Sequence, residues 1–236
     1  MRIVSTAAAR DQHGFVRDWL DSRRHWPKAE WWFYTEGYTL DEPGLVCRDV
    51  ADIPGLAEWK ARHAHRTFKD WRWDVVRWSN KVFAPIDALY DYDGVGVWMG
   101  ADCVTYRPIP PGLIEAAVAN DYCAFYLRNE LPPECDFWVM NCAHPEHKAF
   151  LDFMREFYFT DKVLTLPRHD DCLVWAEALK HFADRITVNN LSGKHSGASH
   201  PQALSDLGRY IDHRKGPRKQ SAFSPENEYH REFLRA

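Results

Sequence analysis

The residues near the carboxyl end of the chain that are best suited to chemistry are a histidine, a glycine and a lysine. His213, Gly216 and Lys219 are spaced three apart in the run Y-I-D-H-R-K-G-P-R-K-Q, with Arg218 beside the lysine. A neutral imidazole can ligate a divalent cation, a glycine lets backbone approach an anion closely, and a lysine neutralises phosphate charge. The pattern H-x-x-G-x-x-K therefore suits a metal-bound diphosphate. The structural alternative is a solvated basic tail.

A second group of candidate residues lies in the middle of the chain. Lys81 belongs to a predicted helix, and Asp102 follows an apolar strand predicted at 95–99, after Gly100 and Ala101. Ligands of open α/β sheets gather at the carboxyl ends of the strands, so Asp102 stands where a metal or a substrate would be bound. A turn or a helix cap is the structural alternative for a lone aspartate at a strand end.

The elements that must position these residues alternate along the chain. Strands are predicted at 3–5, 31–34, 95–99, 103–106, 122–127, 137–140 and 186–191. Helices are predicted at 12–25, through most of 56–84, and at 113–119, 146–159 and 172–182, while 39–55 is predicted to be a loop. This alternation predicts an α/β fold with a mostly parallel central sheet flanked by helices. From Ser192 onward the chain is predicted to be mostly irregular, and to fold over the site as a lid.

Composition limits the classes of partner. The chain has 30 basic and 34 acidic side chains and a net charge of -4, so no chain-wide field attracts nucleic acid or an anionic membrane. A polyanion would have to be met locally, by the basic segment 209–219. The six cysteines form no C-x-x-C pair, which argues against a zinc ribbon and a disulfide framework. No stretch approaches the ~20 apolar residues of a membrane span, and we expect a cytoplasmic protein.

Other motifs for chemistry are incomplete. His63 and His65 form H-x-H, and His144 and His147 lie three apart, but no H-E-x-x-H accompanies them. A zinc hydrolase, the reading that these histidines leave open, predicts stoichiometric zinc. The chain has no G-x-G-x-x-G fingerprint, no phosphate-binding G-x-x-x-x-G-K-[ST] and no G-x-S-x-G nucleophile elbow.

The order of these elements and residues resembles the GT-A glycosyltransferases, especially the glycogenin-like and lipopolysaccharide-galactosyltransferase-like group. Those enzymes use a D-x-D motif and a distal histidine to hold manganese on the diphosphate of a nucleotide sugar. The resemblance implies that Asp102 and His213 are ligands of Mn or Mg, and that Lys81 contacts the donor. Gly100, Ala101 and Asp102 match the D-x-D motif. His213, Gly216 and Lys219 match the downstream motif, and Lys81 matches the helix lysine.

The chain departs from the family pattern at the first acid of D-x-D, which is Gly100. Asp102 and His213 can still hold Mn or Mg if diphosphate oxygens and water complete the shell. Alternatively the site works without a metal. In that case Lys81, Arg218 and Lys219 neutralise the departing nucleoside diphosphate.

A second resemblance concerns the acceptor half of phage and bacterial GT-A-like proteins. It is carried by D-F-W-V-M-N-C at 136–142 and by P-R-H-D-D-C-L-V-W at 167–175. The resemblance implies that His169, Asp170 and Asp171 are catalytic residues facing the transferred sugar. A carboxylate there can hold sugar hydroxyls, stabilise an oxocarbenium-like transition state or take the proton of the acceptor. A cap on the helix that follows is the structural alternative.

By position in this fold, Thr6, Ala7 and Glu36 meet the nucleotide. The resemblance thus implies one domain over 1–236, with a nucleotide-binding half at 1–102, an acceptor half at 103–191 and a basic lid at 192–236. It implies an enzyme, a hexosyl- or pentosyltransferase, that moves a sugar from a UDP- or GDP-sugar to a hydroxyl. The acceptor would be a hydroxymethylated pyrimidine in phage DNA, a saccharide or a protein. The alternative is a catalytically inactive GT-A-like module that binds a sugar nucleotide or nucleic acid.

Overall fold

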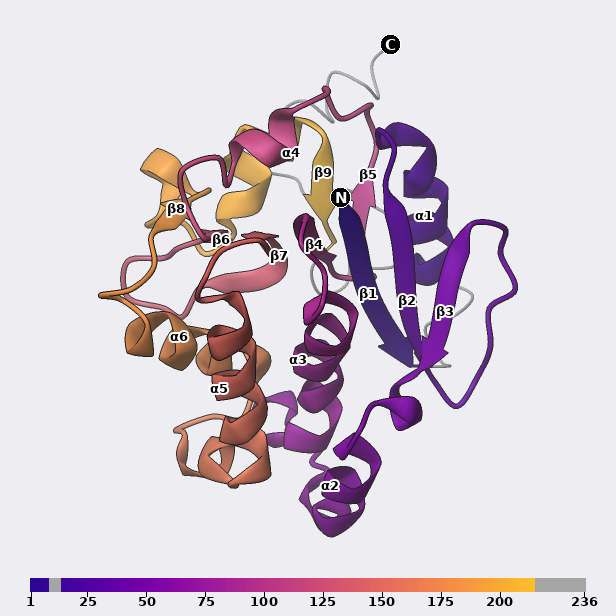
Figure 1. Ribbon diagram of the computed structural model, residues 1–236, viewed down its shortest axis with the longest axis vertical. Helices are drawn as coiled ribbons and strands as arrows, with labels where there is room; N and C mark the ends of the chain where they lie inside the picture. Colours follow the sequence, from indigo (N-terminus) through magenta and orange to yellow (C-terminus); the bar gives the residue numbers. More distant parts are fainter. Residues whose placement is uncertain (9–13, 215–236) are drawn as a thin grey trace.

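The computed structural model describes residues 1–8 and 14–214 of the chain. Its centre is a seven-stranded sheet with the strand order β3-β2-β1-β4-β7-β6-β8 (Figure 1). All neighbouring strands are parallel except β7, which is antiparallel to both β4 and β6. The sheet is therefore mostly parallel, as predicted. The strands are β1 (Arg2–Ala8), β2 (Glu30–Glu36), β3 (Leu45–Asp49), β4 (Val95–Met99), β6 (Cys123–Tyr126), β7 (Glu134–Asn141) and β8 (Val188–Asn190).

Two cores form because successive residues of a strand point to opposite faces of the sheet. On β1, Val4 packs into a core that includes the buried faces of α2 (Leu56–Arg62), α3 (Val75–Leu89), α5 (His147–Phe159) and α6 (Asp171–His181). The neighbouring Ile3 packs into the other core, which includes α1 (Phe15–Asp21) and α4 (Leu113–Ala116). Helices thus cover both faces of the sheet, and only the strand ends remain for a site (Figure 1).

A second, two-stranded sheet joins β5 (Cys103–Thr105) to β9 (Ile211–His213). The strands are antiparallel, and Cys103 pairs with His213. Beyond β9, the backbone N–H of Arg214 donates to the carbonyl of Asp102 at 2.9 Å. This pairing holds the segment around His213 directly against Asp102.

The prediction that the chain is mostly irregular from Ser192 is wrong for the part that the structure describes. Short 3-10 helices at Gly193–His195, Pro201–Leu204 and Leu207–Arg209 lead into β9. His213 is buried, so this segment forms part of the fold up to residue 214.

One more element prediction is wrong. The predicted loop at 39–55 contains the strand β3. This strand lies at the edge of the sheet, where one side faces water, and its charged residues interrupt the apolar pattern by which a strand is predicted. The segment 56–84 is largely helical, as predicted, but its helix is divided into α2 and α3. There the side chains of Asp70 and Asp74 accept hydrogen bonds from the backbone N–H groups of Arg72 and Arg77, both at 3.1 Å. Such caps begin new helical turns and interrupt the old one.

All six cysteines are free thiols. Within residues 1–8 and 14–214, no helix has both the length and the hydrophobicity needed to cross a bilayer.

Candidate active site

Three side chains from distant parts of the chain meet at the carboxyl edge of the parallel strands. Asp102 follows β4, His213 ends β9, and Asp136 lies near the start of the antiparallel β7. Nε2 of His213 is 3.2 Å from Oδ2 of Asp136 and 3.6 Å from Oδ2 of Asp102. The structure therefore brings together Asp102 and His213, which the sequence proposed as ligands, and adds Asp136, which it did not.

The ring of His213 is oriented by a buried carboxylate. Its Nδ1 lies 2.8 Å from Oε1 of Glu134, and Nδ1 of His200 lies 3.0 Å from the same oxygen. With Nδ1 bonded to Glu134, Nε2 is left to face the two aspartates. Burial alone would lower the pKa of His213, but the charges of Asp136 and Asp102 raise it to about 10. The cluster thus favours a positive charge at Nε2.

Lys81 is a fixed cation at the edge of this cluster. Its Nζ donates a hydrogen bond of 2.5 Å to Oδ1 of Asp136. Burial alone would lower the pKa of Lys81, but the carboxylates of Asp136, Asp171 and Asp102 raise it well above its usual value. Burial would likewise raise the pKa of Asp136, but Lys81 and His213 lower it. Asp136 is therefore ionised at neutral pH.

Asp171 begins α6 and belongs to the same buried charge group. Burial raises its pKa to about 7, with the charges of Asp136 and Asp170 adding to the effect and Lys81 opposing it. A carboxyl group that titrates near neutral pH can accept and release a proton under working conditions. Of the three predicted catalytic residues, Asp171 therefore has the chemistry of a base.

The other two residues of this run are held by local contacts. His169 is buried, its ring meets that of Trp73 edge-on at 5.2 Å, and its backbone N–H donates to the carbonyl of Arg72 at 2.7 Å. Asp170 occupies the N-cap position of α6, with Nε of Arg168 at 3.1 Å from its Oδ2. Asp170 thus has the position of a helix cap, although its side chain makes no capping hydrogen bond.

The residues predicted to meet the nucleotide lie at the ends of β1 and β2. Thr6 Oγ1 donates to the carbonyl of Tyr34 at 2.7 Å, and Ala7 pairs with Thr35 across the two strands. Glu36 forms an ion pair with Lys60. These strands are parallel to β4, so their carboxyl ends lie at the same edge of the sheet as Asp102. The predicted donor-binding residues Gly216, Arg218 and Lys219 lie outside the described residues.

The donor set of the cluster fits a divalent cation. The ligand atoms of Asp102, Asp136 and His213 all lie within 4.8 Å of one another. Carboxylate oxygens and one imidazole nitrogen are ligands that Mn²⁺ accepts. The hydrogen bond from His213 to Glu134 is the arrangement by which proteins orient a metal-binding imidazole.

Two of the histidines considered for zinc, His63 and His147, have structural partners. His63 Nε2 lies 2.9 Å from Oδ1 of Asp161. His147 is buried between the hydroxyl of Tyr122 and the carbonyl of Leu89, at 3.2 and 2.9 Å. These contacts account for both residues without a metal.

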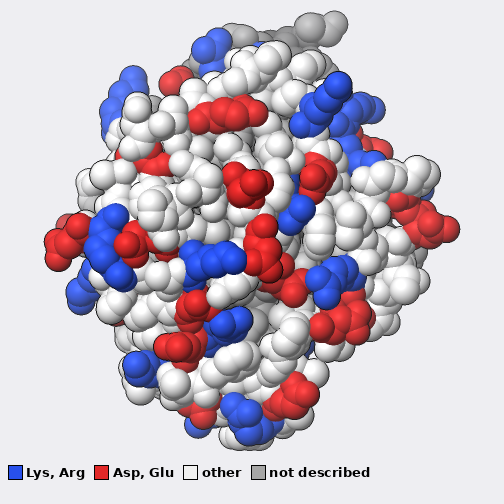
Figure 2. Space-filling model, in the orientation of Figure 1, with Lys and Arg blue, Asp and Glu red and all other residues white. Residues whose placement is uncertain are grey.

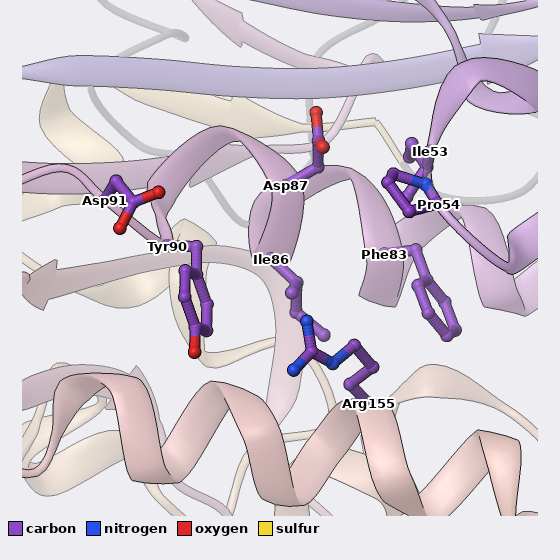
Figure 3. Close-up of a pocket in the computed structure, with 8 residues that line it drawn as sticks. All are labelled: Ile53, Pro54, Phe83, Ile86, Asp87, Tyr90, Asp91 and Arg155. Carbon is purple, nitrogen blue, oxygen red and sulfur yellow. The ribbon is translucent and has the colours of Figure 1, made fainter.

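A surface pocket lies along α3, and none of the residues that line it belongs to the acidic cluster. Figure 3 shows the side chain of Arg155, from α5, extending toward Ile86 of α3. The carboxylate of Asp87 is already bonded to the hydroxyl of Tyr34 and to Arg48, both at 2.6 Å. The pocket thus lies apart from the acidic cluster. Its lining residues are Ile53, Pro54, Phe83, Ile86, Asp87, Tyr90, Asp91 and Arg155.

No protein-family model matches the chain, and no curated protein sequence matches it. Among solved structures, it is similar to the galactosyltransferase LgtC in complex with donor and acceptor sugar analogues, with a TM-score of 0.56 and 10% identity over 92% of this chain and 88% of LgtC. An active-site mutant of LgtC aligns with a TM-score of 0.55 and 11% identity over 98% and 94% of the two chains. The glycosyltransferase GlyE of Streptococcus pneumoniae TIGR4 aligns with a TM-score of 0.49 and 10% identity over 81% of this chain, which spans only 45% of GlyE.

The two LgtC structures establish the fold. This chain has the GT-A fold of glycosyltransferases, as its sequence resemblance implied.

Proposed function

We propose that the protein is a nucleotide-sugar-dependent glycosyltransferase that moves a sugar from a UDP- or GDP-sugar to a hydroxyl acceptor. The observation that carries the proposal is the meeting of Asp102, Asp136 and His213 at the carboxyl edge of a sheet with the GT-A fold. This edge is where ligands of open α/β sheets bind. The chain would act as one domain, with its donor half at 1–102, its acceptor half at 103–191 and the basic segment 192–236 beside the donor, where His213 lies.

On the donor side, Thr6, Ala7 and Glu36 would contact the nucleoside, because they lie at the ends of β1 and β2. Asp102 and His213 would hold a divalent cation, Mn²⁺ or Mg²⁺, which when bound supplies positive charge to the diphosphate. Lys81 would contact the donor beside them. Arg218 and Lys219 would add positive charge as the nucleoside diphosphate leaves, and Gly216 would let the backbone approach it closely.

On the acceptor side, Asp171 would serve as the base, assisted by Asp170 and His169. The bond between the anomeric carbon and the diphosphate oxygen breaks, and a bond forms from that carbon to the acceptor oxygen. The hydroxyl proton passes to the carboxylate of Asp171, whose pKa of about 7 suits this transfer. The protein contributes position and charge, and the nucleoside diphosphate carries the electron pair away.

For the acceptor, exposed aromatic side chains near His169 favour a saccharide. Trp71 is 49% exposed and Trp73 is 40% exposed, and tryptophan faces can cover the apolar faces of sugar rings. A hydroxymethylated pyrimidine in phage DNA is the second candidate. On the face of the molecule shown in Figure 2, basic side chains are mixed with acidic ones, an arrangement that suits a neutral glycan better than a polyanion. A protein is the third candidate acceptor. We also propose that the enzyme acts in the cytoplasm.

The test is release of free UDP or GDP from a panel of sugar donors, with and without Mn²⁺, in the presence of saccharide, protein or hydroxymethylated DNA acceptors. Turnover that is abolished by Asp102→Ala or His213→Ala is the expected result. Glu115→Gln, a change of an exposed acid on α4, is the control. Donor binding without turnover over the whole panel would instead identify the chain as an inactive sugar-nucleotide-binding module.

A further inference from the structure

Gly100 stands where the GT-A pattern has an acid, and the structure gives a spatial reason for the glycine. A Cβ atom at position 100 would lie 3.1 Å from Oδ1 of Asp102, 3.2 Å from Oδ1 of Asp136 and 3.3 Å from the carbonyl oxygen of Asp136. These distances are shorter than about nine in ten of the contacts that Cβ atoms make in known proteins, so a side chain at position 100 would force its neighbours to shift. The backbone of Gly100 is not left-handed, so the glycine is needed for space and not for an unusual conformation.

Strand pairing delivers Asp136 to that space. Met99, the last residue of β4, pairs with Phe137 of β7, and the N–H of Gly100 donates to the carbonyl of Asp136 at 2.7 Å. Because β7 is antiparallel to β4, a residue near its start lies at the carboxyl edge of β4. The carboxylate of Asp136 therefore enters the cluster from β7, next to Gly100, which has no side chain.

The two oxygens of Asp136 have different surroundings. Oδ1 accepts a 2.5 Å hydrogen bond from Nζ of Lys81, whereas Oδ2 faces Nε2 of His213 at 3.2 Å. Lys81 thus balances part of the negative charge and leaves one oxygen directed at the cluster. A carboxylate held in this way can give one ligand atom to an ion.

We propose that Oδ2 of Asp136 is a protein ligand of the divalent cation, together with Asp102 and His213, and that Gly100 makes room for it. The inference rests on the cation site of the proposed function and adds a ligand from β7. Two carboxylates that each give one oxygen, with one imidazole nitrogen, suit six-coordinate Mn²⁺ better than Ca²⁺, which takes six to eight oxygens in a flexible shell. About three positions of the Mn²⁺ shell remain for water or diphosphate oxygens.

Titration of the protein with Mn²⁺, followed by the electron paramagnetic resonance signal of the free ion, tests the ligand directly and without any sugar transfer. We expect Asp136→Asn and Asp102→Asn each to weaken Mn²⁺ binding by about tenfold or more, and Glu115→Gln to leave it unchanged. Circular dichroism and thermal unfolding establish that each variant is folded. Wild-type affinity in a folded Asp136→Asn protein that binds Mn²⁺ through Asp102 would overturn the proposal.

A measurement on the unmodified protein avoids any question of folding. Line broadening of bound Mn²⁺ in ¹⁷O-enriched water counts the water molecules in the shell of the ion. Three protein ligands leave about three waters in a six-coordinate shell. A count of about four would show that Asp136 does not bind the ion, and would overturn the proposal.

A double-mutant cycle tests the role of Gly100. In the wild-type background, Gly100→Ala should weaken Mn²⁺ binding, because the new methyl group displaces the carboxylate of Asp136. In the Asp136→Ser background the same change should cost less, since the crowded carboxylate is gone and only the contacts with Oδ1 of Asp102 and with the backbone carbonyl at position 136 remain. Additive effects of the two changes would overturn this part of the proposal.

These measurements separate the inference from the proposed function. Mn²⁺ bound through Asp136 with no turnover on any donor would support the inference and contradict the transferase. Sugar transfer with Mn²⁺ held by Asp102 but not by Asp136 would do the reverse.

Discussion

Oε1 of Glu134 accepts hydrogen bonds from Nδ1 of both His213 and His200, at 2.8 and 3.0 Å. All three side chains are buried. A carboxylate shared by two imidazoles fixes the plane and the tautomer of each ring. The direction in which His213 presents Nε2 to Asp102 and Asp136 therefore depends on a residue that has no place in the sugar-transfer reaction itself.

This relationship gives the first prediction. Glu134→Gln keeps the shape and one acceptor oxygen but removes the charge that makes the imidazole of His213 a strong ligand. Loss of such an outer partner typically costs 10–100-fold in metal affinity, and we expect Mn²⁺ binding measured by calorimetry to weaken by at least the lower figure. Unchanged affinity would mean that Glu134 has only a packing role.

Asp171 gives the second prediction. Asp171→Asn should lower kcat by about 10²–10⁴-fold, because the base is lost, with little change in donor affinity. In the wild-type protein, kcat should fall as pH decreases through about 7, since the carboxylate is the active form and its pKa is raised to about 7. The variant should lack this acid limb. Rate measurements from pH 5.5 to 8.5 on both proteins make the comparison, and an identical limb in the variant would assign the titration to another group.

His147 gives a prediction on stability against pH. Burial lowers the pKa of its imidazole, although the hydrogen bond to the carbonyl of Leu89 partly opposes the effect, and Lys148 and His144 lower it further. The unfolded chain takes up the proton near pH 6.5, whereas the folded protein does so only at lower pH. The free energy of unfolding should therefore fall as pH decreases below about 6.5.

The test of that prediction is urea unfolding at pH 7.5, 6.5 and 5.5. His147→Gln should be less stable at pH 7.5, by about 1–3 kcal/mol, because it disturbs the buried contacts with Tyr122 and Leu89. It should lose less further stability on acidification than the wild type. Parallel curves for the two proteins would show that His147 does not titrate in this range.

Gly208 gives a prediction on the segment that precedes β9. A Cβ there would lie 2.5 Å from the carbonyl oxygen of Gln202 and 2.9 Å from that of Ala203, both of which are backbone atoms. Gly208→Ala should therefore destabilise the protein by about 1–3 kcal/mol and weaken Mn²⁺ binding by displacing β9. Gly197→Ala is the matched control, because its nearest neighbour is Nδ2 of Asn129 at 3.7 Å. Equal melting temperatures for the two variants would contradict the argument.

The parts of the fold that could be predicted are those with a strong local pattern. The apolar run at 95–99 predicts a buried strand, and the rule that ligands meet strand ends then places Asp102 at the site. The strand β3 was missed because Arg48 and Asp49 break the apolar pattern at an edge that faces water. The strand β9 was missed because three residues within polar sequence carry too little periodicity, and only the pairing with β5 makes them a strand.

The acids of β7 show the limit more sharply. The strand at 137–140 was predicted, and Glu134 and Asp136 precede it in the sequence, so two acids before an apolar run were the available signal. Whether they lie at the active edge of the sheet depends on the direction of β7. In a parallel strand they would lie at the opposite edge, and nothing local in the residues determines that β7 runs antiparallel to β4.

The pairing of β5 with β9 has a consequence for how a newly made chain acquires activity. All seven strands of the main sheet are complete by Asn190, whereas His213 is synthesised more than twenty residues later. A nascent polypeptide could thus collapse around its sheet well before it can capture an ion. Cation binding would then report that assembly has finished, and a stalled or clipped product that stops after β8 would have the strands of the main sheet but lack His213.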